Sequence, residues 1–497
     1  MSNKHILVAV LIAGCTGSPD ADVASTSDPV RLVDPRAGTL LVNSSTAPSA
    51  ITAPGYLTLS LSSPASNATQ ARFFCDGQPL SAALFQAPFW IGVPVDEAEN
   101  GTHRYSASVV VGGATVASND VWLTVSITGG VETITSTFAS KPIAGSIAAV
   151  TTTSVGDLVA VGTGAPGSNT NPPTSMALFW ARGFDGVSTF LDADTKRSST
   201  WSAVASGLGN DVIVRAGSAL VGGQRDAVIS GLSRRTGAVN FDDKFHVEYD
   251  AAREDDEALG VAASNDATFV VVGYETRGGV RSGWATKYDT NGATRWTQRF
   301  QSTASEPWAI ARAVAVGTDR SVYVAGQMET MISFGTHYGT LVPVRVPFLA
   351  KLAADGTLLS TRLDYSFFGE YESVSVANDG HVVVSGSAEN NVAVVTALEA
   401  NGAERWSTRL QNAYGQVRSS LDNRGAVYVH ISAGPNAANT IGPPSTIAKL
   451  ASDGRILWQR NSNVAGLAQT VDTRSSPEGY IVAGSNDGMW TLGTVTP

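Results

Sequence analysis

A short motif recurs along the C-terminal three-quarters of this 497-residue chain, and it restricts the fold more than any other feature of the sequence. The motif is a β-prone, valine-rich run that usually ends in glycine. Its seven copies lie at residues 158–162, 212–217, 269–273, 322–326, 382–386, 427–431 and 480–484. A period of 45 to 60 residues indicates a set of similar structural units packed side by side.

The same repeats share a second feature, a tight turn that ends in glycine and is followed four residues later by an aromatic residue. The pairs are Gly186 and Phe190, Gly237 and Phe241, Gly292 and Trp296, Gly402 and Trp406, and Gly454 and Trp458, whereas Gly356 is followed by Ser360. Glycine in such turns supplies the positive φ angles that a short hairpin needs. We expect the aromatic side chains to pack between neighbouring repeats and not to bind a ligand.

Each repeat has room for four short antiparallel strands, which is the make-up of one blade of a β-propeller. The two ends of the repeated region also fit together. Residues 132–138 form a fourth strand without a blade, and residues 489–495 form a third strand that lacks its fourth. Pairing these segments completes a seventh blade and removes an exposed strand edge. The sequence therefore predicts an all-β fold with a seven-bladed β-propeller over residues 130–497.

Residues 36–128 differ from the repeats and have the pattern of a smaller all-β domain. Apolar and polar residues alternate with period two at 56–61 and 105–110, which predicts short strands. Strands at this spacing favour an antiparallel β-sandwich. Within it we expect Cys75 to be a small buried strand residue, and His103 to be a strand residue rather than a ligand.

The first fifteen residues have the pattern of a secretory signal. A basic start precedes an apolar run at residues 6–13, which is too short for a membrane span of about 20 residues. Residues 16–35 are rich in Ser, Asp, Pro and Ala and cannot bury a core, so we expect a flexible tether there. The net charge of −10 argues against a nucleic-acid ligand.

The sequence Ile12-Ala13-Gly14-Cys15 resembles a bacterial lipobox, although Leu is the commoner residue where Ile12 stands. The resemblance implies cleavage before Cys15, acylation of that cysteine with chains such as palmitate, and a stable lipid anchor. Thr16 in place of Asp implies delivery to the outer membrane, on its periplasmic or cell-surface side. Because Cys75 is the only other cysteine, we expect no disulfide within the mature chain.

Two further resemblances concern the folded regions. Residues 100–107 and 118–125 look like the end of a bacterial Ig-like module, which implies a spacer or adhesive unit. Residues 130–497 are similar to bacterial propeller repeats, including those of quinoproteins. Quinoprotein blades carry the docking motif Ala-x-Asp-x-x-Thr-Gly-x-x-x-Trp, of which this chain keeps only the Gly-x-x-x-Trp end. The resemblance therefore implies the fold and not the quinone cofactor.

No pattern in the sequence indicates a catalytic or metal centre, so we expect neither a metal nor a cofactor. The six histidines lie far apart, and the nucleophile-elbow and phosphate-loop motifs are absent. The acidic run at residues 253–257 lacks the alternating oxygen ligands of a calcium loop. We interpret it as a solvated charged loop.

Long connections would emerge on one face of the propeller, at residues 163–174, 242–257, 327–346 and 433–444. Binding residues concentrate on variable loops over a rigid scaffold. Our ligand-binding candidates are the aromatic and polar residues Trp308, His337 and Tyr338. The alternative is that these side chains only cap the central channel.

These observations predict a non-catalytic, monomeric envelope lipoprotein. Its membrane contact is the lipid anchor, its sandwich is a spacer, and its propeller is a recognition platform for a protein or polysaccharide. One alternative is a propeller enzyme, either a degenerate quinoprotein or a polysaccharide-acting hydrolase, which acids such as Glu257 and Glu372 at the start of the inner strands would favour. Another alternative is an envelope-assembly scaffold.

Overall fold

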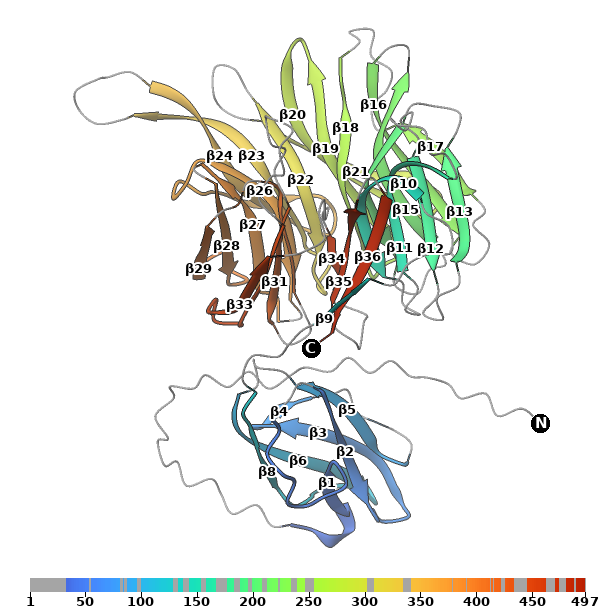
Figure 1. The fold of residues 1–497 in the computed structure, drawn as a ribbon, viewed down its shortest axis with the longest axis vertical. Coiled ribbons are helices and arrows are strands. Elements are labelled where there is room, and N and C mark those ends of the chain that lie inside the picture. Colours follow the sequence, from blue (N-terminus) through green and yellow to red (C-terminus); the bar gives the residue numbers. More distant parts are fainter. Residues whose placement is uncertain are drawn as a thin grey trace. The chain divides into compact units, whose positions relative to one another are not determined.

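The structure is a computed structural model. It describes residues 33–52, 55–80, 84, 87–95, 100–127, 133–136, 143–152, 158–166, 177–182, 188–194, 199–207, 212–221, 224–233, 239–245, 254–301, 308–333, 341–377, 379–389, 391–411, 413, 415–421, 425–432, 445–461, 470–472, 480–486 and 489–496. Apart from the 3-10 helix η1 (Pro35–Ala37), every regular element in these residues is a strand (Figure 1). No helix among them is long and apolar enough to cross a bilayer. The chain divides into two compact units between Thr133 and Ile134.

The first unit contains two antiparallel sheets. The three-stranded sheet has the order β1 (Thr39–Val42), β2 (Gly55–Ser62), β5 (Trp90–Val95). The five-stranded sheet has the order β4 (Gln78–Pro79), β3 (Ala68–Cys75), β6 (Gly101–Val111), β7 (Ala114–Ala117), and β8 (Val121–Val125) also pairs with β6. Both sheets contribute to one hydrophobic core, which includes Leu59, Phe73 and Tyr105. The predicted alternation is observed in β2, where Leu57, Leu59 and Leu61 are buried and Thr58 and Ser60 between them are more accessible.

The second unit is Ile134–Leu421 with Val427–Thr496, and most of its strands form four-stranded antiparallel sheets in chain order. These sheets are β14 (Ser199–Ser206), β15 (Val212–Val221), β16 (Gln224–Ser233), β17 (Val239–Phe245); β18 (Glu257–Ala263), β19 (Thr268–Arg277), β20 (Val280–Asp289), β21 (Thr294–Phe300); β22 (Ala309–Val316), β23 (Val322–Ser333), β24 (Leu341–Leu352), β25 (Leu358–Leu363); β26 (Gly369–Val376), β27 (Val382–Ala388), β28 (Val392–Leu398), β29 (Glu404–Gln411); and β30 (Val417–Leu421), β31 (Val427–Ile431), β32 (Thr446–Leu450), β33 (Ile456–Asn461). Five of the seven copies of the repeated motif lie in these sheets, each in the second strand of its sheet.

The remaining strands bring the two ends of this unit together. They are β9 (Thr133–Ser136), β10 (Ile143–Thr152), β11 (Leu158–Pro166), β12 (Ala177–Arg182), β13 (Ser188–Asp194), β34 (Thr470–Asp472), β35 (Tyr480–Asn486) and β36 (Met489–Thr496). Strand β9 pairs with β36, so the predicted pairing of the two end segments is confirmed. These eight strands form one sheet. We call the strand that precedes each copy of the repeated motif a first strand, and there are seven: β10, β14, β18, β22, β26, β30 and β34. Each first strand contacts the next in this order, and β34 contacts β10.

A steric constraint explains why the repeated motif ends in glycine. Five first strands bulge directly opposite this glycine, at Gly162, Gly217, Gly273, Gly326 and Gly386. A Cβ atom on any of the last four would lie 1.8 to 2.0 Å from a backbone oxygen of the first strand, where no side chain fits. In the pair β30–β31, Ile431 replaces the glycine and the register is continuous. The glycine therefore allows the first strand to bulge against the second.

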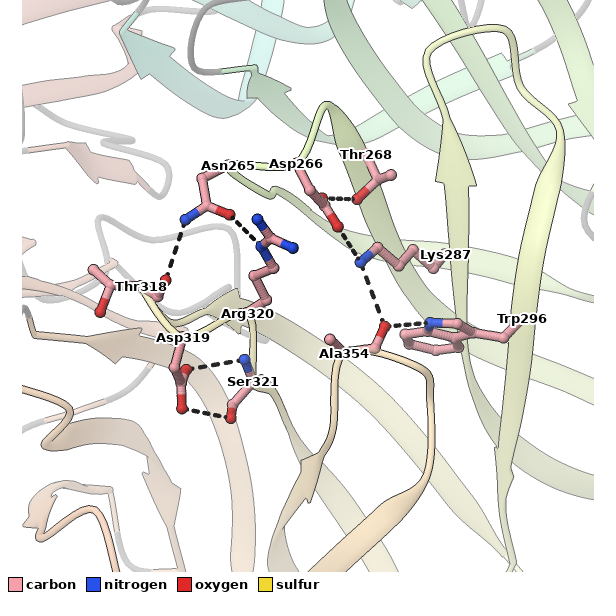
Figure 2. Close-up of polar contacts among 10 residues, drawn as sticks. All are labelled: Asn265, Asp266, Thr268, Lys287, Trp296, Thr318, Asp319, Arg320, Ser321 and Ala354. Carbon is pink, nitrogen blue, oxygen red and sulfur yellow. Dashed lines mark hydrogen bonds and ion pairs between the residues drawn. The ribbon is translucent and has the colours of Figure 1, made fainter.

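Two of the hairpin aromatic residues, Trp296 and Trp406, join neighbouring sheets, as predicted. The indole Nε1 of Trp296 on β21 donates a 3.0 Å hydrogen bond to the backbone oxygen of Ala354, in the β24–β25 turn of the next sheet (Figure 2). A Cβ atom on Gly356 would lie 2.7 Å from the Trp296 ring, so this turn needs glycine for a second reason besides its φ of 90°. Trp406 makes the equivalent 2.7 Å bond to Ser452 in the sheet after its own.

A lysine reinforces the same junction between sheets. Lys287 on β20 is 4% exposed, and its Nζ lies 2.9 Å from the Asp266 carboxylate and 3.4 Å from the Ala354 oxygen (Figure 2). Although burial alone would raise the pKa of Asp266, hydrogen bonds from Thr268 and Lys287 hold it far below its ordinary value. These polar contacts lie between short turns and are satisfied within the protein, so we assign them to the scaffold.

Candidate functional site

Charged side chains gather at the start of four consecutive first strands. They are Glu257 on β18, Arg312 on β22, Glu370 and Glu372 on β26, and Arg418 on β30, and we call them the inner-strand charge cluster. Arg312 interacts electrostatically with Glu257, and Arg418 interacts with both glutamates of β26. The cluster therefore spans four sheets of the second unit. Two of its members, Arg312 and Glu372, are the extra residues of β-bulges.

The ion pair between Arg312 and Glu370 joins two adjacent sheets. The Nε atom of Arg312 donates a hydrogen bond to Oε2 of Glu370. Both side chains remain partly accessible, with exposed fractions of 30% and 20%. The guanidinium thus occupies a position where it balances the negative charge of β26 and also reaches solvent.

Glu372 is more deeply buried, with 5% of the residue exposed, and both of its carboxylate oxygens accept hydrogen bonds. Oε1 accepts from the hydroxyl of Ser387 at 2.6 Å, and Oε2 accepts from the backbone nitrogen of Val417 at 2.6 Å. Burial raises the pKa of Glu372, and the nearby charge of Glu370 raises it further. Since Val417 belongs to the next sheet, the Glu372 carboxyl group joins β26 to β30.

Arg418, also on β30, adds a second contact to this junction. Its Nη1 donates a 2.7 Å hydrogen bond to the backbone oxygen of Glu372, while its Nε has no hydrogen-bond partner among the described residues. Burial lowers the pKa of Arg418. His430 pairs with Arg418 in the β30–β31 register and is fully buried. Burial and the Arg418 charge lower the pKa of His430 to about 4, so this imidazole is neutral at pH 7.

Glu257 lies at the other end of the cluster and is partly buried. The hydroxyl of Tyr274 donates a 3.4 Å hydrogen bond to its Oε2. Burial raises the pKa of Glu257, although three arginines, Arg225, Arg312 and Arg281, act in the opposite direction. Arg281 also lies over the Tyr274 ring, 4.7 Å from its centroid.

The acidic run before β18 differs from the solvated loop expected from the sequence. Its acids accept hydrogen bonds from backbone nitrogens of other strands and turns. Glu254 accepts from Gly279 at 2.9 Å, Asp255 accepts from Arg225 at 3.0 Å, and Asp256 accepts from Thr276 at 2.8 Å. Asp256 is only 6% exposed. The expectation was wrong because otherwise unpaired backbone donors at the ends of β16 and β19 hold these carboxylates in place.

Of the three ligand-binding candidates, the structure describes Trp308, which is partly buried directly before β22. The guanidinium of Arg345 on β24 lies 4.1 Å from the centroid of the indole ring. The backbone oxygen of Trp308 accepts a 2.8 Å hydrogen bond from Glu329 on β23. Trp308 therefore sits at the base of the β23–β24 hairpin. His337, Tyr338 and the lipidation candidate Cys15 lie outside the described residues.

One group of described residues has the atoms of a metal site, and it lies in the first unit. Cys75, Asp76 and His103 offer ligand atoms within 4.8 Å of one another. The Cys75 sulfur is part of a disulfide whose partner lies outside the described residues, so it is not available as a thiolate ligand. This bond also differs from the expectation that the chain forms no disulfide.

Asp76 and His103 instead hold a turn. His103 Nδ1 lies 2.7 Å from Asp76 Oδ2, and the backbone nitrogen of Arg104 donates to Asp76 Oδ1 at 2.8 Å. Burial alone would raise the pKa of Asp76, but these two hydrogen bonds lower it. They stabilise Asp76 at its positive φ of 48°. His103 is thus a buried strand residue, as expected, and Cys75 is buried too.

The sequence singled out two of the five cluster residues, Glu257 and Glu372. It missed Arg312, Glu370 and Arg418, because these charges occur in different repeats at no fixed spacing. The glycine of the repeated motif could have indicated the two bulge residues, because the bulges lie opposite this glycine. A bulge opposite that glycine redirects one side chain per first strand, and only Arg312 and Glu372 carry charge there among the five bulges described.

No protein-family model matches the chain, and no curated protein matches it. Similar solved structures include the β-propeller domain of the Trilobed protease from Pyrococcus furiosus. It is 10% identical to this chain, and the match covers 72% of this chain and 94% of that one, with a TM-score of 0.39. Sqt1 from Chaetomium thermophilum, solved with the N-terminus of ribosomal protein L10, shares 11% identity over 71% of this chain and 97% of its own, with a TM-score of 0.41. A protein of unknown function from Bacteroides caccae is 14% identical, and the match covers 61% of this chain and 93% of that protein, with a TM-score of 0.36. These similarities are distant and identify no activity.

Proposed function

We propose that this protein is an exported lipoprotein whose second unit is a seven-bladed β-propeller that recognises a protein or glycan without catalysis. In this proposal Cys15 carries the lipid anchor in the outer membrane, and the first unit is an Ig-like spacer. The seven-bladed ring is supported by the cyclic contacts among seven first strands and by the pairing of β9 with β36. In such a ring β9 is the fourth strand of the seventh blade.

The observation that carries the non-catalytic assignment is that both glutamates on β26 are already bonded to other groups of the protein. Glu370 is paired with Arg312, and both oxygens of Glu372 accept hydrogen bonds from Ser387 and Val417. General acid–base catalysis needs a group that exchanges a proton with substrate in the transition state. Carboxylates that already join adjacent sheets are better suited to stabilise the scaffold.

In this proposal, aromatic and polar side chains on one face of the propeller contact the ligand, and Trp308 is the candidate among them that the structure describes. Its indole is partly accessible and stacks with Arg345, and such aromatic and arginine side chains often dominate binding energy. The full chain carrying Cys15→Ser, which stays in solution, is screened on a glycan array and with displayed peptides. We expect Trp308→Ala to weaken capture of a selected ligand by about tenfold or more.

The matched control is Trp122→Ala in the first unit, where the residue is 61% exposed. This variant should bind as the parent does, because the first unit is only a spacer. Equal loss of binding in both variants would show that the aromatic contact is nonspecific. A parent protein that captures neither glycan nor peptide would contradict the recognition proposal.

A propeller enzyme is the second candidate, because Glu257 and Glu372 occupy the start of the first strands and burial raises the pKa of each. Raised carboxyl pKa values suit general acids near neutral pH. A panel of aryl glycosides and primary alcohols tests this candidate. Turnover that falls by a factor of about 10² or more in Glu257→Gln would establish catalysis.

Lipidation of Cys15 also determines the chemical state of Cys75. In a lipidated chain the Cys15 sulfur is alkylated by the glyceryl carbon of a lipid, and a sulfur in the resulting thioether is unable to form a disulfide. Because the chain has two cysteines, a lipidated protein must hold Cys75 as a thiol. The lipoprotein and the disulfide-bonded form are therefore alternative states of the chain, and mass spectrometry distinguishes them.

A further inference from the structure

Three side chains with metal-ligand atoms meet in the first unit, where β3 ends. Cys75 is the last residue of β3, Asp76 begins the turn to β4, and His103 lies on the neighbouring strand β6 (Figure 1). The Cys75 sulfur lies 3.7 Å from Asp76 Oδ2, and this oxygen lies 2.7 Å from His103 Nδ1. All three ligand atoms lie within 4.8 Å of one another.

The strand register explains why the sulfur and the imidazole are close together. Cys75 pairs with Tyr105 between β3 and β6, and His103 precedes Tyr105 by two residues. Residues two apart on a strand share a face of the sheet. All three side chains are buried, so this is the face that carries the core. Cys75 and His103 therefore lie side by side at the end of the buried face.

The backbone of Arg104 holds the Asp76 carboxylate beside this pair. The backbone nitrogen of Asp76 donates to the Arg104 oxygen at 2.9 Å, and the Arg104 nitrogen donates to Asp76 Oδ1 at 2.8 Å. The other oxygen, Oδ2, is directed to Cys75 and His103. Such outer bonds orient metal ligands. The Asp76 side chain is 40% exposed, so an ion reaches the group from solvent past this carboxylate.

The distances among the three atoms are close to those among the ligands of a tetrahedral ion. With bonds of about 2.3 Å to sulfur and about 2.0–2.1 Å to nitrogen and oxygen, zinc ligands lie about 3.3–3.6 Å apart. The distance of 3.7 Å between the sulfur and the carboxylate already fits. The 2.7 Å distance from the carboxylate to the imidazole must lengthen by about 0.6 Å. Small side-chain rotations therefore make room for an ion.

We propose that Cys75, Asp76 and His103 bind a zinc ion when Cys75 is a thiol. Thiolate and imidazole ligands select zinc over calcium and magnesium, which prefer oxygen ligands alone. The thiol loses its proton to solvent as the ion binds, and the neutral imidazole binds through Nδ1. Three protein ligands leave the fourth position of the ion to a water molecule.

The chemical state of Cys75 decides whether this site exists. A disulfide at Cys75 removes the thiolate ligand, whereas lipidation of Cys15 leaves Cys75 as a thiol because the chain has only these two cysteines. In the cell the inference therefore rests on the proposed lipidation. The zinc site then belongs to the lipidated protein and not to the disulfide-bonded one.

Cobalt(II) tests the site in the full chain with Cys15→Ser, purified with a phosphine reductant so that Cys75 is a thiol. Cobalt accepts the same ligands as zinc, and a thiolate bound to it absorbs in the near ultraviolet. We expect this absorption to saturate at one equivalent of cobalt and to disappear when zinc is added. Its absence in excess cobalt would overturn the proposal. The disulfide-bonded parent should not absorb, and absorption there would also overturn it.

Substitutions identify the ligands. Cys75→Ser should abolish the near-ultraviolet absorption, and His103→Gln or Asp76→Asn should weaken zinc affinity by about tenfold or more. The matched control is Asp120→Asn, an exposed acid of the same unit, which should bind within about twofold of Cys15→Ser alone. Thermal unfolding without metal identifies the variants that remain folded. Unchanged zinc affinity in His103→Gln and Asp76→Asn, or absorption retained in Cys75→Ser, would overturn the proposal.

The protein extracted from membranes separates this inference from the proposed function. A parent chain with lipidated Cys15 that binds no zinc would overturn the metal site and leave the lipoprotein standing. A parent chain with Cys15 and Cys75 joined in a disulfide would contradict the lipoprotein. In that case cobalt binding by the reduced Cys15→Ser chain would still support the metal site.

Discussion

The Oε2 atom of Glu372 accepts a 2.6 Å hydrogen bond from the backbone nitrogen of Val417, and this contact joins the first strands of two adjacent sheets. Arg418, the next residue, also donates to Glu372, to its carbonyl oxygen at 2.7 Å. Both donors therefore lie on β30 and both acceptors belong to Glu372. These contacts connect segments 45 residues apart in the chain, which no local pattern reveals.

We expect Glu372→Ala to lower the free energy of unfolding by about 1–3 kcal/mol, because it leaves the buried Val417 N–H without an acceptor. Glu372→Gln keeps an acceptor oxygen and should lose less. Urea unfolding monitored by tryptophan fluorescence measures both variants. Equal stability of Glu372→Ala and the parent would show that the junction between β26 and β30 does not depend on this carboxylate.

Stability should fall in acid because of His430. Its pKa is lowered from 6.5 to about 4, so between these values the unfolded chain binds a proton that the folded protein does not. The free energy of unfolding therefore decreases as pH falls through this window, by at most about 3 kcal/mol. Urea unfolding between pH 7 and pH 4 measures the slope. His430→Gln should have a shallower slope, and an identical slope would assign the loss to other groups.

We expect Gly386→Ala to be strongly destabilising, by about 3 kcal/mol or more, because its Cβ atom would lie 1.8 Å from the oxygen of Glu370. Gly402→Asn is the control, since Gly402 has a φ of 86° with open space around it and Asn tolerates that conformation. Thermal unfolding compares the two. A stable Gly386→Ala variant would mean that β26 forms without its bulge.

Deleting residues 489–497 removes β36 and leaves β9 without its partner. We expect exposed strand edges on β10 and β35, with aggregation and faster proteolysis than in the parent. Size-exclusion chromatography and limited trypsin digestion report both effects. A monomeric, protease-resistant deletion variant would contradict the assignment of β36 to the closing blade.

In its native host, Cys15→Ser should move the protein from the membrane fraction to the soluble fraction, because acylation is lost. In the membrane-extracted parent, iodoacetamide should label Cys75 after unfolding without reductant, since an acylated Cys15 is unable to pair with it. Intact-mass analysis reads both modifications. Labelling of Cys75 only after reduction would favour the disulfide and reject lipidation.

Local features of the sequence determined the strands and their turns. Period-two alternation and valine-rich runs mark strands because side chains alternate between the faces of a sheet. The positive φ of Gly292 and Gly402 follows from the hairpin turns in which they stand. The pairing of β9 with β36 was also predictable, because counting strands along equal repeats leaves one unpaired strand at each end.

Only the tertiary structure decided where the charges meet. Arg312, Glu370 and Arg418 come from three different sheets, and their proximity depends on how neighbouring sheets pack. The acids at 254–256 likewise find backbone donors on strands that no local pattern places beside them. Alternation and turn chemistry act over a few residues. Ion pairs between sheets depend on register and bulges, which form only when distant segments pack together.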